Sequence, residues 1–170
     1  MNRNHNRTLF ILALAALLGI THVQQVLALS DEIIKQRIEA VANIPELKGT
    51  KVGVVVEDSY VVLYGKVRLY SQKMMYERIA WQTMGVVEVE NEIRVVPRVP
   101  LADRAIERKI REIVKTYPRF HGAQVEIRVE EGSVFLRAII EHPRDIIFLK
   151  HRVAEIEGVI AIEIEAAFRV

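Results

Sequence analysis

Along residues 31–96, hydrophobic residues recur first with the period of a helix and then with that of two strands. A second helical period and a last strand period follow. The order of these periods predicts helix, strand, strand, helix and strand. The helical stripes fall at Ile34, Ile38 and Val41 and at Tyr76, Ala80 and Thr83. The strand alternations fall at Val52, Val54 and Val56, at Val61, Leu63 and Gly65, and at Val87, Val89, Ile93 and Val95. We therefore expect a three-stranded sheet covered on one face by two helices.

Polar residues and glycines predict where these elements begin and end. Ser30 or Asp31 is suited to cap the first helix, and Asp58-Ser59 forms a tight turn between the first two strands. Ser71 would begin the second helix, and Gly85 would end it as a C-cap. These signals agree with the element order that the hydrophobic pattern predicts.

The same pattern occurs a second time in the C-terminal half of the chain. Gly85-Val86 aligns with Gly158-Val159 at an offset of 73 residues, and Asp31 aligns with Asp103 at an offset of 72. A one-residue gap in a loop accounts for the difference. The matching helix and strand positions are Ile106, Ile110 and Ile113; Val125, Ile127 and Val129; Val134 and Leu136; Leu149, Val153 and Ile156; and Ile160, Ile162, Ile164 and Phe168.

Between the two copies lies Pro97-Arg98-Val99-Pro100, whose prolines oppose both strand pairing and helix continuation. We therefore divide the chain into unit 1 (residues 31–96), a linker (97–100) and unit 2 (101–170). The expected fold class is α+β, with two tandem αββαβ units, each a three-stranded mixed sheet packed on one face by two helices. Each unit has only about 70 residues and a modest core, so packing between the units would stabilise both.

The first 28 residues have the features of a signal peptide. Arg3, His5 and Arg7 precede an apolar run from Leu9 to Ile20, and the small residue Ala28 stands where signal peptidase would cut. We expect cleavage after this residue and a periplasmic mature protein. The alternative is an uncleaved signal that anchors the protein in the inner membrane, although the apolar run is shorter than the roughly 20 residues of a span.

Composition narrows the classes of function. The chain has 170 residues, 51% hydrophobic and 27% charged, and can therefore fill a core. It contains no cysteine, which excludes disulfides, thiolate metal sites and a cysteine nucleophile. Its net charge of +2 comes from Arg3 and Arg7, and the remainder is neutral. A neutral body lacks the broad basic field of a nucleic-acid-binding protein.

Residues with catalytic or metal-binding chemistry are not arranged as a site. His121, His142 and His151 have no histidine three or four residues away, as a zinc pair on a helix would require. A contact between His142 and Asp145 would be a cap at the start of a helix. We therefore expect no enzyme, no cofactor and no metal site. One alternative stays open, because Glu88, Glu90 and Glu92 alternate along one strand and form either a solvated face or a cation site.

An Asp-capped helix, a valine-rich hairpin, and a helix followed by Gly-Val and a strand together resemble the BON domain. The residues that carry the resemblance are Val54, Val56, Val61, Leu63, Gly65, Val67, Ala80, Gly85, Val86 and Val89 in unit 1, and Val129, Gly132, Val134, Leu136, Gly158, Val159 and Ile162 in unit 2. This family occurs in bacterial envelope proteins linked to osmotic shock and nodulation. The resemblance implies a non-enzymatic module that associates with phospholipid membranes or envelope partners.

Each unit departs from the family pattern at one point. Unit 1 has Asp58-Ser59 where the family prefers a turn with glycine. Unit 2 has Arg137-Ala138 where the family usually has a small residue followed by glycine. We therefore expect the second strand of unit 2 to be bent or otherwise altered.

Two helical surfaces could bind a membrane or a partner. Arg104, Arg108, Arg111 and Lys115 fall within about 60° of one another on the first helix of unit 2. They would either hold anionic lipid headgroups or form a solvated face that Glu107 and Glu112 partly neutralise. On the second helix of unit 1, Met74, Trp81 and Met84 lie off the inner stripe, where they would either dock on a membrane or partner or pack between the units.

The outward faces of the two sheets differ. Unit 1 presents Val55, Tyr60, Val62 and Tyr64, and unit 2 presents Arg128, Ser133, Phe135 and Arg137 at the matching positions. The face of unit 2 should be wet, whereas the apolar face of unit 1 should be covered by unit 2 or by another copy. Val55, Val62 and Tyr64 are therefore a candidate self-association interface.

The hypothesis that follows is an exported, non-catalytic protein that associates with an anionic phospholipid membrane or with envelope proteins, in envelope maintenance or osmotic stress. The alternative is a periplasmic structural or chaperone-like protein-binding module that self-associates. Vesicle co-sedimentation would distinguish the two.

Overall fold

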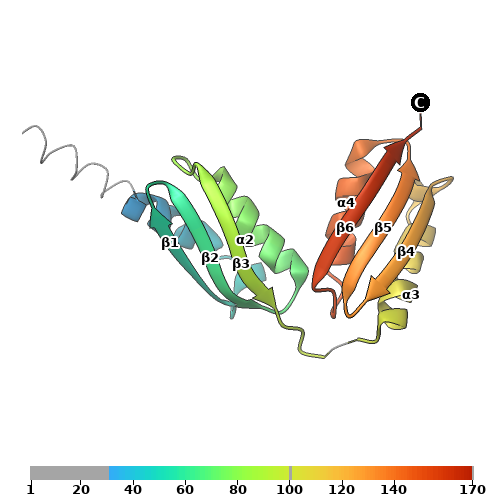
Figure 1. Cartoon of the computed structure of the whole chain (residues 1–170), viewed down its shortest axis with the longest axis horizontal. Coiled ribbons are helices and arrows are strands. Elements are labelled where there is room, and N and C mark those ends of the chain that lie inside the picture. Colours follow the sequence, from blue (N-terminus) through green and yellow to red (C-terminus); the bar gives the residue numbers. More distant parts are fainter. Residues whose placement is uncertain (1–30, 100, 170) are drawn as a thin grey trace, which may run out of the picture.

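The computed structural model describes residues 31–99 and 101–169 (Figure 1). Unit 1 consists of a helix over residues 31–42, the 3-10 turn η1 (Pro45–Leu47), β1 (Lys51–Glu57), β2 (Tyr60–Val67), α2 (Tyr70–Gln82) and β3 (Glu88–Val95). Unit 2 consists of α3 (Asp103–Thr116), η2 (Pro118–Phe120), β4 (Gln124–Glu130), β5 (Ser133–Ile140), α4 (Pro143–Ala154) and β6 (Ala161–Phe168). The predicted αββαβ order is confirmed in both units.

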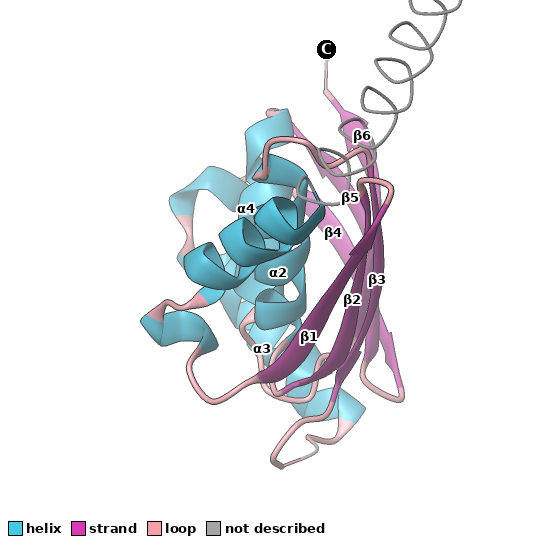
Figure 2. Cartoon of the chain, turned by 90° about the vertical axis from the view of Figure 1, so that its left-hand side faces the viewer, coloured by secondary structure: helices cyan, strands magenta, loops and turns pink. Residues whose placement is uncertain are grey.

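Each unit forms its own three-stranded mixed sheet. The strand orders are β1-β2-β3 and β4-β5-β6, with the first pair antiparallel and the second parallel. The register repeats as well, because Val61 pairs with Val89 in unit 1 and Val134 pairs with Ile162 in unit 2, 73 residues later in both strands. The helices lie on one face of the sheets and leave the other face open (Figure 2). The predicted α+β class is therefore confirmed.

Two separate cores lie between the helices and the sheets. In each core five side chains from the predicted stripes are at most 2% exposed, namely Ile34, Ile38, Leu63, Ala80 and Ile93 in unit 1 and Ile106, Ile110, Leu136, Leu149 and Val153 in unit 2. Burying a large aliphatic side chain contributes about 1.5–3 kcal/mol. The aliphatic stripes read from the sequence are therefore what hold each helix to its sheet.

An aspartate at the start of each unit's first helix holds the hairpin turn of the same unit. The Asp31 carboxylate accepts backbone hydrogen bonds from Asp58 and Ser59, both at 2.9 Å. The Asp103 carboxylate accepts them from Glu131 and Gly132 at 2.9 and 3.0 Å. The four turn residues have positive φ angles, as a two-residue type I′ turn requires. The aspartates thus link helix to hairpin, and the N-cap residue of α3 is Ala102, which makes no side-chain cap.

Three details of the predicted helices and strands are wrong. Val41 is 54% exposed and does not belong to the inner stripe, because the helix turns it away from the core. α2 begins at Tyr70 and not at Ser71, and the Gln72 amide oxygen accepts the preceding backbone N–H groups at its start. Val87 and Ile160 lie just before β3 and β6 and do not belong to these strands, whereas Phe168 ends β6 as predicted.

The expected bend in the second strand of unit 2 is also wrong. β5 pairs with both neighbours without interruption, and Ala138 is fully buried in it. The distortion lies instead in β2 of unit 1, where the aligned Gly65 has φ +125°. A Cβ atom there would overlap the carbonyl oxygen of Lys51. Glycine is therefore needed in unit 1, whereas regular strand geometry in unit 2 accepts alanine.

Unit 1 and the linker both contact unit 2. α2 lies beside α4 (Figure 1). The Glu157 carboxylate accepts the backbone N–H of Arg98 at 2.7 Å and lies 3.5 Å from Nε of Arg68. Tyr70 packs against the core of unit 2. The mutual packing predicted from the small size of each unit is present.

The predicted signal peptide, residues 1–28, lies outside the described residues. Within residues 31–99 and 101–169, no helix has the length and apolar character needed to cross a bilayer.

Candidate functional site

The basic stripe, defined as Arg104, Arg108, Arg111 and Lys115, is exposed along the whole of α3. The buried residues of this helix, Ile106 and Ile110, point toward the core. Within the described part of the chain, one ion pair involves the stripe, a 3.5 Å contact between Arg111 Nη2 and Glu107 Oε2. The pair is exposed and contributes little to stability. The stripe therefore presents its charges to solvent.

The matching helix of unit 1 carries no such stripe. At an offset of 72 residues the four cations align with Glu32, Gln36, Glu39 and Asn43, all exposed. The Gln36 amide donates to the Glu32 carboxylate at 2.8 Å, so this surface is satisfied internally. The fold does not require cations at these positions, since unit 1 builds the same helix without them.

Trp81 and its neighbours form an apolar surface at the C-terminal end of α2. Trp81 is 52%, Met84 80% and Val87 74% exposed, whereas Met74 is half-buried. The contact with unit 2 is made at the other end of α2 by Tyr70. Burial and, to a smaller degree, the charge of Glu77 raise the pKa of its phenol, and the neighbouring backbone of Ile162 lowers it in part. Trp81 thus remains available at the surface.

The outer face of unit 1 is apolar at its centre and acidic along β3. Val55 and Tyr64 are each 47% exposed, so unit 2 does not cover them. The Tyr60 hydroxyl donates to Glu90 Oε2 at 2.7 Å. This hydrogen bond, with smaller effects from desolvation and from the charges of Glu88, Glu90 and Glu92, raises the pKa of Tyr60 to about 12.

A glycine shapes this outer face. Gly53 pairs with Tyr64 across β1 and β2, and a Cβ atom at Gly53 would overlap the tyrosine ring. The ring therefore lies over the glycine, which gives a flat apolar surface next to Val55. An aromatic residue opposite a strand glycine replaces the packing that the glycine lacks.

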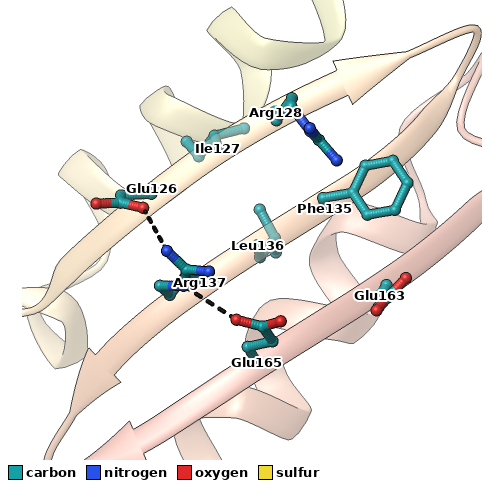
Figure 3. A pocket seen from close by; sticks show the side chains of 8 residues that line it. All are labelled: Glu126, Ile127, Arg128, Phe135, Leu136, Arg137, Glu163 and Glu165. Carbon is teal, nitrogen blue, oxygen red and sulfur yellow. Dashed lines mark hydrogen bonds and ion pairs between the residues drawn. The ribbon is translucent and has the colours of Figure 1, made fainter.

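The outer face of unit 2 holds a polar hollow of about 480 Å³ (Figure 3). Arg137 lies at its centre, with Nη1 3.6 Å from Glu126 and Nε 3.0 Å from Glu165. The hydrogen bond to Glu165 raises the pKa of this guanidinium. The Arg128 guanidinium lies 4.7 Å from the centroid of the Phe135 ring. Arg137 thus joins Glu126 and Glu165 across the three strands, and the face is polar, as predicted.

The predicted contact between His142 and Asp145 is made by backbone atoms. The N–H of Asp145 donates to the His142 carbonyl oxygen at 2.9 Å. The buried Asp145 carboxylate instead accepts from Arg119 Nη1 at 3.3 Å, and the Arg119 guanidinium stacks 4.0 Å from the Phe148 ring centroid. These contacts fix η2 against α4. Among the residues described, no group of three or more His, Asp or Glu side chains could hold a metal ion.

Sequence reasoning did not find Tyr70, Arg119 or the bridge made by Arg137. Their partners lie on other elements, between 11 and 92 residues away, and a local pattern does not reveal such pairs. The one available signal is the repeat, because Glu163 and Glu165 align with Glu90 and Glu92 at an offset of 73. An acidic row on the last strand is thus common to both units.

Comparison with protein families identifies the first of the two units. The family model of the BON domain matches residues 30–97. This segment is a BON domain. The match supports the assignment of an envelope-associated, non-enzymatic domain, in agreement with the resemblance drawn from its valines and from Gly85-Val86.

Among solved structures, the chain is similar to two structures of CdsD from Chlamydia trachomatis. One is the C-terminal domain of CdsD, described as the structural protein of the Type III secretion system, at 13% identity and a TM-score of 0.36. The chain covers 67% of that structure, which covers 82% of this chain. The other CdsD structure has 14% identity, a TM-score of 0.35 and coverages of 63% and 82%. No curated protein matches the chain.

Proposed function

We propose that the protein is an exported tandem BON protein that binds anionic phospholipid surfaces through the basic stripe of α3, in a role in envelope maintenance. Unit 2 is proposed as a second BON domain. Unit 2 repeats the strand order of unit 1 and its antiparallel and parallel pairings. It also repeats the hydrogen bonds from the hairpin turn to an aspartate carboxylate, here that of Asp103.

One observation carries the membrane proposal. Four exposed cations lie on one face of α3, while the same positions of unit 1 are acidic or neutral. Each cation near an anionic bilayer contributes about 1 kcal/mol, so four together give about 4 kcal/mol. The mature chain is neutral as a whole, so the part outside the stripe has 18 basic against 22 acidic residues, and attraction to an anionic membrane would be local to the stripe.

Vesicle co-sedimentation tests this proposal. Residues 29–170 should bind vesicles of equal parts phosphatidylglycerol and phosphatidylcholine but not pure phosphatidylcholine. Binding should weaken from about 0.01 M to about 0.15 M salt, as the screening length falls from about 30 Å to about 8 Å. Replacing Arg104, Arg108, Arg111 and Lys115 by Gln should weaken binding at least about 10-fold.

The matched control removes four exposed cations elsewhere. Arg37, Lys48, Arg78 and Arg94 are exposed and lie outside the stripe. Their replacement by Gln changes the net charge equally and should leave most of the binding intact. Equal binding by the stripe variant and the wild type would refute the proposal. A blue shift of Trp81 fluorescence on vesicles would add insertion of the apolar end of α2 to electrostatic contact.

The proposed localisation has its own test. A signal peptide cut after Ala28 leaves a chain that begins at Leu29. Mass spectrometry of the protein recovered from the periplasm should give the mass of residues 29–170. The full-length mass in the inner-membrane fraction would establish an uncleaved anchor instead.

A second candidate function is favoured by the outer face of unit 1. Val55 and Tyr64 remain 47% exposed within the chain, which is unusual for neighbouring apolar residues on a sheet. This face supports a protein-binding module that self-associates. Sedimentation of residues 29–170 over a range of concentrations tests it, and a monomer at every concentration would refute it.

A further inference from the structure

The four edge strands of the two sheets differ in how they discourage pairing with another chain. Edge strands are commonly protected by charges within the strand or by a covering group. Interior charges are present on β3 (Glu90, Glu92), on β4 (Glu126, Arg128) and on β6 (Glu163, Glu165). Tyr70 also lies beside Ile162 of β6, packed against the same core. β1 has the interior sequence Val-Gly-Val-Val-Val, with charges only at its ends.

The hairpin geometry shows which backbone groups of β1 point outward. A two-residue turn makes Glu57 and Tyr60 a hydrogen-bonded pair, and this property alternates along an antiparallel ladder. The N–H and C=O groups of Val52, Val54 and Val56 therefore point away from β2. Within the described residues, β2 is the only strand beside β1. These three residues thus present a row of donors and acceptors at the edge.

We propose that β1 pairs antiparallel with β1 of a second copy, about a two-fold axis through Val54, so that two unit 1 sheets become one six-stranded sheet. The proposal rests on the self-association candidate above and names its strand and register. In this register Val52 hydrogen-bonds with Val56 of the second copy. Lys51 lies opposite Glu57 of the second copy at both ends of the seam.

Charge complementarity selects a second copy as the occupant. Lys51 and Glu57 are exposed and lie on the outer face, in line with Gly53 and Val55. Antiparallel pairing about the centre of the strand places each cation opposite an anion, whereas parallel in-register pairing would place like charges together. The sequence of β1 is therefore complementary to itself in one orientation.

The outer face supports the same register. Gly53 would lie opposite Val55 of the second copy, and the Tyr64 ring lies over Gly53. The second copy's valine would therefore abut that ring, which covers part of the exposed surface of both residues. The two apolar faces join into one surface across the seam, and each copy contributes the same contacts, as a two-fold interface requires.

Charge reversal tests the register in residues 29–170 by sedimentation velocity. The wild type should be a dimer. Lys51→Glu and Glu57→Lys should each raise the dimer dissociation constant at least tenfold, because each places like charges opposite one another at both ends. The double variant K51E/E57K should restore the dimer. Glu130→Lys, at the position of β4 that matches Glu57, should leave the dimer unchanged, and far-ultraviolet circular dichroism checks folding.

Cross-linking tests the strand directly, because the chain has no cysteine. A mixture of Lys51→Cys and Glu57→Cys chains should form a disulfide-linked dimer on mild oxidation, and neither chain alone should do so, since only the mixed pair lies opposite across the seam. Gln124→Cys mixed with Glu130→Cys is the control on β4 and should not cross-link.

The outcomes distinguish self-association of the protein from pairing through β1 in particular. A dimer that persists in both single charge variants, or that fails to cross-link in the mixture, overturns the β1 seam while self-association stands. A monomeric wild type overturns both and leaves the edge to a strand of a different protein. Loss in the single variants, recovery in the double variant and cross-linking in the mixture together support the seam.

Discussion

At the scale of residues, the Asp31 carboxylate joins two elements of unit 1 that are far apart in sequence, the first helix and the hairpin turn. It accepts both N–H groups of the Asp58-Ser59 turn, and these groups otherwise lack a partner in the hairpin ladder. The same device recurs at Asp103. A carboxylate at this position therefore serves the turn more than its own helix.

Removing the Asp31 carboxylate, which holds the hairpin turn to the first helix, should destabilise unit 1 selectively. Hydrogen bonds to a charged group contribute about 1.5–3 kcal/mol when buried and less when exposed. Asp31→Ala should therefore lower the free energy of unfolding of unit 1 by about 1–2 kcal/mol. Trp81, the only tryptophan, lies in unit 1 and reports its urea unfolding by fluorescence. The control Glu39→Ala removes an exposed acid from the same helix, and an equal loss in both variants would contradict the role of the Asp31 carboxylate.

Tyr60 should titrate well above other exposed phenols. Its hydrogen bond to Glu90 raises its pKa to about 12, so the folded state holds the proton more tightly than the unfolded state. This contribution to stability is present below pH 10 and is lost as the pH rises toward 12. Glu90→Gln should return the pKa toward 10, as measured by NMR titration of the Tyr60 ring carbons. Glu163→Gln, at the matching position of unit 2, is the control and should leave this pKa unchanged.

At the scale of elements, β2 has Gly65 with a positive φ angle at the position where its counterpart β5 has Ala138. Gly65→Ala should cost about 3 kcal/mol or more, because a positive φ costs about 1–3 kcal/mol and the methyl group also meets the Lys51 carbonyl oxygen. Gly49→Ala is the control, since it has φ +81° but open space around it, and should cost about 1 kcal/mol. Urea unfolding followed through Trp81 measures both. Similar losses would show that the approach of Lys51 does not matter.

The order of the elements could be predicted because each is encoded locally. Val52, Val54 and Val56 alternate within one strand, and Ile106 and Ile110 face one core from one helix, so short-range periodicity is sufficient. The distortion at Gly65 could not be placed, because it depends on a neighbouring strand. Asp31 was recognised as a helix-start residue, but its actual partners are 27 and 28 residues away.

The two candidate surfaces could be predicted from the sequence, whereas the contact between the units could not. The basic stripe follows from helical spacing alone, and the structure exposes it as the spacing indicates. The apolar outer face of unit 1 follows from alternation, and the structure adds that unit 2 leaves it exposed. The contact between the units was not predictable at residue level, because Tyr70 lies at a helix start and meets a strand 92 residues later.

At the scale of the whole molecule, the two units are joined by few contacts, and each can be tested separately. Glu157 bridges to Arg68 and to the backbone of Arg98, but its ion pair is partly exposed and contributes about 1 kcal/mol or less. Tyr70 is half-buried against the core of unit 2 and lies beside Ile162. Tyr70 should therefore dominate the coupling between the units.

Amide hydrogen exchange at Ile162 measures that coupling without altering either core. β6 is an edge strand, and Tyr70 lies beside Ile162 where unit 1 meets unit 2. Tyr70→Phe keeps the ring and removes the hydroxyl beside the Ile162 backbone, and should speed exchange by no more than about 5-fold, the equivalent of losing one hydrogen bond of about 1 kcal/mol. Tyr70→Ala also removes the packing and should speed exchange further. Met84→Ala, at the exposed surface beyond the other end of α2, should leave exchange at Ile162 unchanged. Unchanged exchange at Ile162 in Tyr70→Ala would mean that the two units are held together by the linker and not by this contact.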